Sequence, residues 1–498
     1  MTIAQIIGVV VVVALAALGG FFIVTKSKKH DLAKWVGLFF LVALALTWIL
    51  PFGYFVGESY TEYGMAQVGI THIPNLFYYA VYMIGDKVLF LLSLGAFYAV
   101  ISKCGGYKKL VTTLAKILKG KEIITVLLAS LLFTAMGSLL TQTWAALVFV
   151  PFVISVLLSM KLDKITAFSA TFASIIIGTL GVTYGSEGLD WFNYYTEASI
   201  NVALVYRLIV LIVGFLAFNF FNVLHIKKTL ENKPKNETSA DPYKIETVDN
   251  KEKIWPTIVV FALIFVLVLL GCIGWEINFE FTWFREIHEK LIALKIGELA
   301  IFEKILGIIH APFGNWNLFH LSTLLVFFSI IMALISRINL NDYIENFGEG
   351  LKKMLKPTLI YVTIYVIMLI VFDANSNYGQ SIMANVTNAL TQNVEKFNPF
   401  LATLNALFAN IFHSNFGLTG YSSAAAWIAM YGNNLNVIHT IFTTTYGFVS
   451  LCVPTSGLLL IGLSYLDIEY KNWMKYIWMC VLALLVILLI LFTVMTYI

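Results

Sequence analysis

Two clusters of small polar residues and glycines interrupt apolar stretches of the sequence. The first joins the runs 123–140 and 144–160 and consists of Gly137, Ser138, Thr141, Gln142 and Thr143. The second interrupts residues 401–432 and contains Ser414, Asn415, Thr419, Gly420, Ser422 and Ser423. Helix ends at such breaks offer N–H groups to a carboxylate, while freed carbonyls and hydroxyls can bind Na⁺. Small residues also let helices pack closely, but the symmetric placement of the clusters favours a binding site.

Two longer apolar runs carry breaks of their own. Residues 437–465 contain Thr445, Gly447 and the sequence Pro454-Thr455-Ser456-Gly457, in which the proline interrupts a helix beside new polar termini. The run that ends near residue 187 contains Gly178, Gly181, Thr183, Gly185 and Ser186. Backbone groups without hydrogen-bond partners cannot face lipid, so these breaks must line protein or a watery cavity. We therefore expect a substrate or ion to bind where the breaks and the two clusters meet.

The composition is that of a polytopic membrane protein. Of 498 residues, 59% are hydrophobic and 12% are charged, whereas about one-quarter of a soluble protein is charged. The net charge of +4 gives no indication of a nucleic-acid partner. The four cysteines lack the spacing of metal ligands, and no nucleophile–base pair, HExxH motif or Walker loop is present. We therefore expect neither an enzyme nor a metal centre.

Ten apolar runs approach the roughly 20 residues that a membrane-spanning helix needs. They are 3–24, 35–55, 87–102, 167–183, 203–221, 255–273, 317–335, 357–372, 437–465 and 473–497. The first lacks a preceding basic region and predicts a retained span, not a signal peptide. The interrupted segments 123–160 and 401–432 predict two re-entrant hairpins.

The charges of the loops predict the orientation, because basic loops remain in the cytoplasm. Lysines gather in the loops 25–34, 103–121, 161–164, 225–254 and 337–356, whereas 56–86, 186–201 and 373–400 are acidic. The hairpin 123–160 then enters from the cytoplasm and the hairpin 401–432 from outside. The sequence therefore predicts an inverted-topology repeat, with one repeat at 1–226, a cytoplasmic linker at 227–253 and the second repeat at 254–498.

Residues 283–310 alternate apolar and charged side chains with helical spacing. This pattern predicts an amphipathic helix that lies along the membrane interface. A role as scaffold or dimer contact is the alternative.

Few ionisable residues fall within the apolar runs. Arg207 lies near the end of a span, from which its side chain can extend to the interface, and we place Lys87 at an interface too. Glu187 and His413 are candidates to face the cavity, with a wetted-loop or structural role as the alternative. Because proton-coupled carriers commonly hold a carboxylate deep in the membrane, its absence here favours Na⁺ coupling or exchange.

Three segments carry a family resemblance: TWILPFGYF at 47–55, INLNDYIENFGEGLKKMLKP at 338–357 and VPTSGLLLIGLSYLDIEYKNWMKYIW at 453–478. Through them the chain resembles the YfcC-like, C4-dicarboxylate anaerobic carrier family of the ion transporter superfamily. The resemblance implies an elevator-type carrier with two hairpins, usually dimeric, for dicarboxylates or for amino acids, as in arginine/ornithine exchangers. Leu140-Thr141-Gln142 stands where such carriers often have a Gly-rich acidic pair, which leaves the substrate open.

These observations predict an all-α, multi-pass protein of the cytoplasmic membrane. We expect a homodimeric secondary active transporter that moves a small carboxylate, such as a C4-dicarboxylate, or an amino acid by alternating access. Na⁺ is the only cofactor that we consider, for coupling. The alternatives are an arginine/ornithine antiporter and, from another class, a channel, which needs a continuous pore lined by charged or carbonyl rings.

Overall fold

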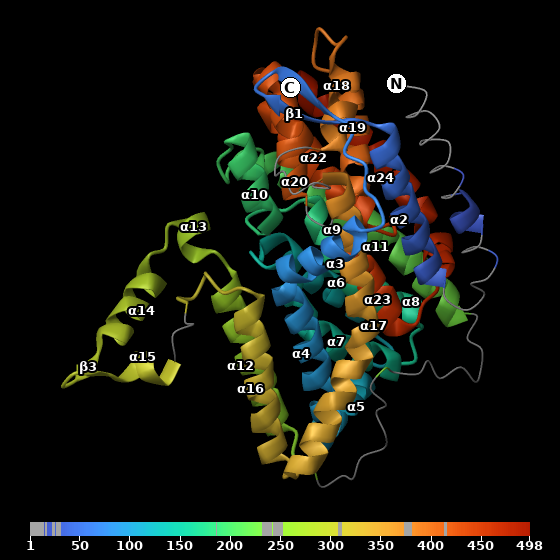
Figure 1. Ribbon diagram of the computed structural model, residues 1–498. Helices are drawn as coiled ribbons and strands as arrows, with labels where there is room; N and C mark the ends of the chain where they lie inside the picture. Colours follow the sequence, from blue (N-terminus) through green and yellow to red (C-terminus); the bar gives the residue numbers. More distant parts are fainter. Residues whose placement is uncertain are drawn as a thin grey trace.

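The computed structural model describes residues 14, 17–21, 25, 31–185, 187–231, 242, 252–306, 311–372, 381–412 and 416–498. The predicted span at 3–24 and the linker at 227–253 lie mostly outside these residues. Ser186, His413, Ser414 and Asn415 lie outside them as well. Within the described residues the protein is mostly helical, with two short β-hairpins (Figure 1).

The first part of the chain runs from helix α2 to the long helix α11. Its elements are α2 (Asp31–Ile49), β1 (Phe52–Val56), β2 (Ser59–Gly64), α3 (His72–Met83), α4 (Gly85–Ile101), α5 (Gly105–Ile117), α6 (Glu122–Leu139), the 3₁₀ helix η1 (Thr143–Phe149), α7 (Val150–Ser159), α8 (Lys164–Phe168), the π-helical turn η2 (Ser169–Ala173), α9 (Ser174–Leu180), α10 (Glu187–Thr196) and α11 (Leu204–Glu231).

The second part runs from α12 to the C-terminal helix α24. Its elements are α12 (Trp255–Cys272), α13 (Trp275–Phe279), α14 (Trp283–Ala293), β3 (Lys295–Ile296), β4 (Leu299–Ala300), α15 (Ile301–Leu306), α16 (Leu318–Ile335), α17 (Leu340–Phe372), α18 (Ile382–Thr391), α19 (Pro399–Ile411), α20 (Gly417–Thr419), the π-helical turn η3 (Gly420–Ala424), α21 (Ala425–Met430), the 3₁₀ helix η4 (Gly432–Asn434), α22 (Leu435–Ser450), α23 (Gly457–Leu466) and α24 (Tyr470–Tyr497).

Seven of the described helices are long and apolar enough to cross a membrane, or eight spans if the bent pair α3–α4 counts as one. The seven are α2, α6, α11, α12, α16, α17 and α24. Other apolar helices are shorter, such as α19 with 13 residues and α23 with 10. The predicted multi-pass membrane protein is confirmed.

The predicted interruptions coincide with helix ends. Helix α6 ends at Leu139 and η1 begins at Thr143, while α22 ends at Ser450 and α23 begins at Gly457. Helix α9 ends at Leu180, before the glycines at 181 and 185. The two π-helical turns are unpredicted; such turns often occur at functional sites because they change the direction of nearby side chains.

Three predicted segments differ in the structure. The run 35–55 is not one helix, because α2 ends at Ile49 and the chain continues into the β1–β2 hairpin, where Gly57 has a φ of +59°. The segment 283–310 is also not one helix: a β-turn with Gly297 at φ +65° separates α14 from α15. Helix α17 begins at Leu340, well before the predicted 357, and has 33 residues with Pro357 inside it.

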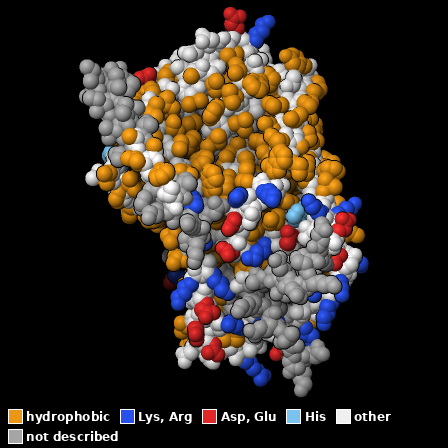
Figure 2. Space-filling model, turned by 90° about the vertical axis from the view of Figure 1, so that its right-hand side faces the viewer, with side chains coloured by type: hydrophobic (Ala, Val, Ile, Leu, Met, Phe, Trp, Pro, Cys, Tyr) orange, Lys and Arg blue, Asp and Glu red, His pale blue; other side chains and the backbone are white. Residues whose placement is uncertain are grey.

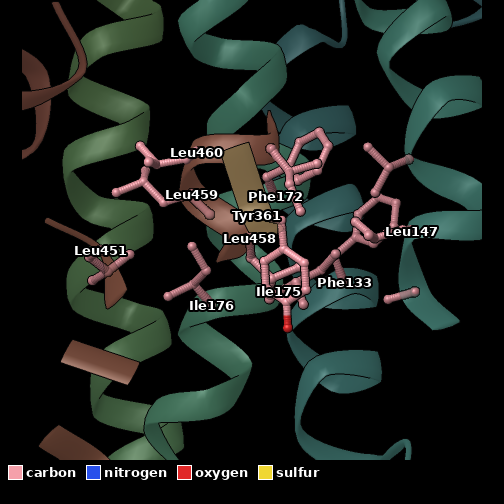
Figure 3. Packing of buried hydrophobic residues seen from close by; sticks show 14 of the residues in the cluster. Phe133, Leu147, Phe172, Ile175, Ile176, Tyr361, Leu451, Leu458, Leu459 and Leu460 are labelled. Atoms are coloured by element: carbon pink, nitrogen blue, oxygen red, sulfur yellow. The ribbon is translucent and has the colours of Figure 1, made fainter. Parts of the chain in front are cut away.

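The apolar core joins the two parts of the chain. In Figure 3, Leu458, Leu459 and Leu460 of α23 lie among Phe172, Ile175 and Ile176 of the η2–α9 segment. Phe133 of α6, Leu147 of η1 and Tyr361 of α17 belong to the same buried cluster. Segments far apart in sequence therefore share one core around the interrupted helices.

The surface is divided between apolar and charged regions. On the face shown in Figure 2, apolar side chains cover most of the upper part and charged side chains gather on the lower part. In Figure 1 the lysine-bearing helix α5 lies at the lower end and the β1 strand at the upper end. The broad apolar region is the surface that lipid can cover.

Candidate binding site

A cavity of about 310 Å³ lies between the first predicted cluster and residues that neighbour the second in the sequence. Gln142, Thr143 and Trp144 line it from the first cluster, and Phe416 and Leu418 line it beside the second. The remaining lining residues are Met83, Ile84, Lys87, Thr179, Gly188, Trp191, Tyr195, Tyr361, Tyr365, Met368, Tyr446 and Leu458. A volume of this size is sufficient for a small-molecule ligand.

Lys87 provides a positive charge in this cavity. Its side chain is 14% exposed, and the carboxylate of Asp86, which is not a lining residue, lies 3.8 Å from its Nζ. Among the lining residues that the structure describes there is no aspartate or glutamate. Lys87 lies in the first turn of α4, directly after the 67° bend between α3 and α4. The sequence signal was a lysine at the start of an apolar run, which also fits the interfacial position that we predicted.

Thr143, a lining residue of the cavity, carries a hydroxyl without a hydrogen-bond partner in the described structure. Its Oγ1 is buried and has no hydrogen-bond partner within the described part of the chain. A buried hydroxyl without a partner is unfavourable, so a ligand that forms a hydrogen bond here gains the interaction that the free protein lacks.

Ser138 connects the end of α6 to the break after α9. Its Oγ donates to the carbonyl oxygen of Gly181 at 2.8 Å and accepts from the backbone N–H of Thr183 at 3.1 Å. Gly185 N–H donates to the carbonyl oxygen of Ser138 at 3.1 Å. These predicted site residues thus form hydrogen bonds with one another and hold the break in position, and none of them is a lining residue of the cavity.

The glycines of this region permit close helix packing. A Cβ added to Gly137 would lie 2.4 Å from the carbonyl oxygen of Ile175, and one added to Gly178 would lie 2.4 Å from that of Thr134. Helices α6 and α9 therefore cross with their backbones nearly in contact, as the packing alternative proposed.

Arg207 is fully buried, which corrects the prediction that its side chain extends to the membrane interface. Nη1 donates to the carbonyl oxygens of Val182 at 2.9 Å and Thr183 at 3.1 Å. Nη2 donates to those of Ile200 at 2.6 Å and Val202 at 3.0 Å. Because Arg207 lies in the first turn of α11, its guanidinium folds back onto the loop before the helix. The cation therefore satisfies the carbonyls that the break after α9 leaves free.

Thr141 anchors the first cluster to α12. Its backbone N–H and its Oγ1 both donate to the carbonyl oxygen of Cys272, at 2.8 and 2.9 Å. Nearby, Asn278 Nδ2 of α13 donates to the carbonyl oxygen of Tyr184 at 3.0 Å. Thr141 thus positions the tip, whereas its neighbours Gln142 and Thr143 line the cavity.

The predicted residues of the 437–465 break also have partners within the protein. Thr445 Oγ1 accepts from Asn410 Nδ2 at 2.9 Å, and Thr455 donates to the carbonyl oxygen of Ile411. Ser456 caps α23, and Pro454 lies in the connection between α22 and α23. Two glycines permit close contacts, Gly447 with Leu180 and Gly457 with the ring of Tyr361.

The second cluster is largely a buried packing motif. Thr419 donates to the carbonyl oxygen of Phe416 at 2.6 Å, and Ser423 accepts from Thr387 at 2.9 Å. Ser422 Oγ lies 3.5 Å from Ser423 Oγ, and Gly420 packs against Phe192 of α10. These residues position the neighbouring cavity residues Phe416 and Leu418.

Helix α10 supplies an aromatic wall that the sequence analysis missed. Trp191 and Tyr195 line the cavity with stacked rings, whose centroids are 6.1 Å apart. His439 Nε2 of α22 lies 2.8 Å from Asn193 Oδ1 and holds the helix in place. The four-residue spacing of the two aromatic rings was visible in the sequence, but the position of the helix was not.

The chain is similar to known proteins over most of its length. The model of the C4-dicarboxylate anaerobic carrier family (DcuC) matches residues 2–497. The Escherichia coli K12 protein named putative basic amino acid antiporter YfcC is 21% identical over 410 residues, which cover 78% of this chain and 73% of that protein. An uncharacterised Haemophilus influenzae protein is 22% identical over 425 residues, 81% and 74% of the two chains.

Two solved structures are also similar. The YdaH transporter of Alcanivorax borkumensis aligns with a TM-score of 0.41 and 11% identity, covering 93% of this chain and 98% of that one. MtrF of Neisseria gonorrhoeae, described as one of a class of antimetabolite efflux pumps, aligns with a TM-score of 0.38 and 13% identity, covering 94% and 95%.

Proposed function

We propose, from the premise that the chain belongs to the C4-dicarboxylate anaerobic carrier family, that it is a secondary active carrier for a small carboxylate or an amino acid. The chain is a multi-pass membrane transporter, and its bacterial relatives place it in the cytoplasmic membrane. The family and the named relative are transporters, so the expectation that the protein is not an enzyme is confirmed.

One observation carries the choice of a carboxylate substrate. Lys87 lines the cavity between the two clusters, and the buried hydroxyl of Thr143 in the same lining lacks a partner within the described residues. An ammonium and a hydroxyl are suitable donors for a carboxylate, and a partly buried charge strengthens such hydrogen bonds. Gln142 adds an amide donor to the same side of the lining.

The repeat and hairpin arrangement is part of the proposal. The convergence of residues 142–144 with residues 416 and 418 at one cavity supports two hairpins that enter from opposite sides. Helix α6 alone is long enough to cross the membrane, so the re-entrant proposal for 123–160 depends on the lysines at both ends. Cysteines at positions 121 and 161 that label from opposite sides of the membrane would contradict it.

Coupling to Na⁺ or exchange, and a homodimeric state, are also proposed. No acidic residue lines the described cavity, which gives no carboxylate for proton coupling there. Two buried oxygens, Asn410 Oδ1 and Thr444 Oγ1, have no hydrogen-bond partner within the described residues. They lie on α19 and on α22, the helix before the break at Pro454. Such oxygens can ligate Na⁺, so NaCl should raise the melting temperature of the detergent-purified protein more than KCl. Cross-linking of the reconstituted protein tests the dimer.

Reconstituted full-length protein tests the function. We expect saturable uptake and counterflow of a C4-dicarboxylate, another small carboxylate or an amino acid, with at least tenfold loss in Lys87→Met and partial retention in Lys87→Arg. Lys119→Met, which removes an exposed lysine outside the cavity lining, is the control. Non-saturating flux without counterflow would indicate a channel. The alternative is an arginine/ornithine antiporter, and the Escherichia coli relative is named a putative basic amino acid antiporter. Such an antiporter would exchange these amino acids and tolerate Lys87→Met.

A further inference from the structure

We infer that the substrate carries a single carboxylate and an apolar, preferably aromatic, body. This inference rests on the proposed function, in which a carboxylate binds at Lys87. It distinguishes among the carboxylates that the family description and the relatives' names leave open. Its evidence is the charge of the cavity and the side chains that line the walls away from Lys87.

The charges of the cavity provide the first argument. Lys87 is the only lysine or arginine among the described lining residues, and its Nζ already lies 3.8 Å from Asp86. A second carboxylate on the substrate would lose its hydration without meeting a second positive charge among these residues. Burying an unpaired charge is strongly unfavourable. An additional cationic group would be repelled by Lys87, since no acidic residue lines the described cavity.

The walls of the cavity provide the second argument. Helix α10 presents Trp191 and Tyr195, and α17 presents Tyr361 and Tyr365, each pair separated by four residues. Residues at this spacing lie on one face of a helix. Two different helices therefore each contribute an aromatic pair to the same cavity.

The contacts between rings extend this aromatic surface. The Trp144 ring lies 4.7 Å from that of Tyr361, measured between centroids, and the ring of Phe416 lies 5.2 Å from that of Tyr446. All four residues line the cavity. Aromatic rings bury large areas and form favourable edge and stacking contacts with a flat partner. A small aliphatic dicarboxylate would leave this surface unused.

Binding of 3-phenylpropanoate and succinate to the purified full-length protein tests the inference. We expect 3-phenylpropanoate to bind at least tenfold more tightly than succinate by isothermal titration calorimetry. Lys87→Met should abolish this binding. Trp191→Leu and Tyr361→Leu should each weaken it about tenfold, while Trp191→Phe, which keeps a ring, should have less effect. Trp283→Leu, in α14 and outside the cavity lining, is the matched control.

The outcomes separate the inference from the proposed function. Tighter binding of succinate that still depends on Lys87 would overturn the inference and leave the carboxylate carrier standing. Equal loss of binding in Trp283→Leu and Trp191→Leu would also overturn the inference. Tight binding of arginine that survives Lys87→Met would overturn both. Binding of neither carboxylate, or binding of both unchanged in Lys87→Met, would contradict the proposed function itself.

Discussion

Nη1 of Arg207 donates a 2.9 Å hydrogen bond to the carbonyl oxygen of Val182, so a fully buried cation holds the backbone break after α9. Two of the four carbonyl oxygens around the guanidinium come from the break itself, before α10, and two from the loop between α10 and α11. The Arg207 guanidinium therefore satisfies the free carbonyls of the break and fixes its backbone. The break directly follows α9, which carries the cavity residue Thr179.

Arg207→Met should destabilise the protein strongly. The substitution leaves the carbonyl oxygens of Val182 and Thr183 buried without this donor and removes the half-buried bonds to Ile200 and Val202. A buried acceptor left unsatisfied costs about 1–3 kcal/mol. We expect a marked fall in the melting temperature in detergent, with Arg207→Lys intermediate because an ammonium cannot reproduce the planar fork. Arg285→Met, which removes a half-exposed ion pair with Glu276, should change stability by less than about 1 kcal/mol. Equal melting temperatures for both methionine variants would contradict this role.

Gly178→Ala should weaken the contact between α6 and α9. The new methyl group would lie 2.4 Å from the Thr134 carbonyl oxygen, a backbone atom that cannot move aside easily. Overpacking of this kind costs about 1–3 kcal/mol. Gly348→Ala is the control, because its Cβ would meet nothing within 4 Å inside helix α17. Thermal unfolding in detergent should show a loss for the first variant and none for the second.

Several features of the fold followed from local chemistry. Pro454 to Gly457 and Leu140 to Thr143 form breaks because proline, glycine and short polar residues disrupt helices wherever they stand. The β1–β2 hairpin was missed because a short apolar strand continues the hydrophobic run of α2 without a change that the pattern reveals.

The site was less predictable, because it depends on contacts between distant segments. Gln142 and Thr143 reach the cavity, whereas Ser138 and Thr455 turn out to satisfy backbone carbonyls. Gly85, two residues before Lys87, marks an interruption in the sequence, but the 67° angle between α3 and α4 cannot be predicted from it. The burial of Arg207 depends likewise on carbonyl oxygens from two segments of the chain that the fold brings to the start of α11.

Thr143→Val should lower the affinity for the transported carboxylate. Valine has nearly the same shape but no hydroxyl, so the hydrogen bond that we propose with the carboxylate is lost. A hydrogen bond to a charged group contributes about 1.5–3 kcal/mol, which corresponds to a rise in KM of about tenfold or more. Uptake kinetics in proteoliposomes measure the change, with Thr493→Val in α24 as the control. An unchanged KM would exclude Thr143 from the substrate contacts.

Asp163 should make stability depend on pH at the acidic end. Burial raises the pKa of this carboxyl, but hydrogen bonds from His225 and Thr166 outweigh it, so the pKa lies below the usual 3.8. His225 Nε2 lies 3.1 Å from Asp163 Oδ2. A lowered pKa means that the carboxylate stabilises the fold fully above pH 3.8, and that this contribution is lost as the pH falls through the folded-state pKa.

Melting temperatures of wild type and Asp163→Asn measure this contribution. The wild-type protein should be the more stable at neutral pH, and the difference should shrink as the pH falls below about 3.8. A difference that stays constant from pH 7 to pH 3 would show that the ionisation of Asp163 does not contribute.

Protection of a single cysteine tests the central claim, that the cavity between the two clusters is the transport site. Gln142→Cys, placed in a background without Cys104, Cys272, Cys452 and Cys480, is treated with N-ethylmaleimide in proteoliposomes that still transport. Saturating substrate should slow its alkylation at least fivefold, while Glu345→Cys, at an exposed position of α17, should react equally with and without substrate. An alkylation rate at position 142 that saturating substrate leaves unchanged, in protein that transports normally, would contradict the account.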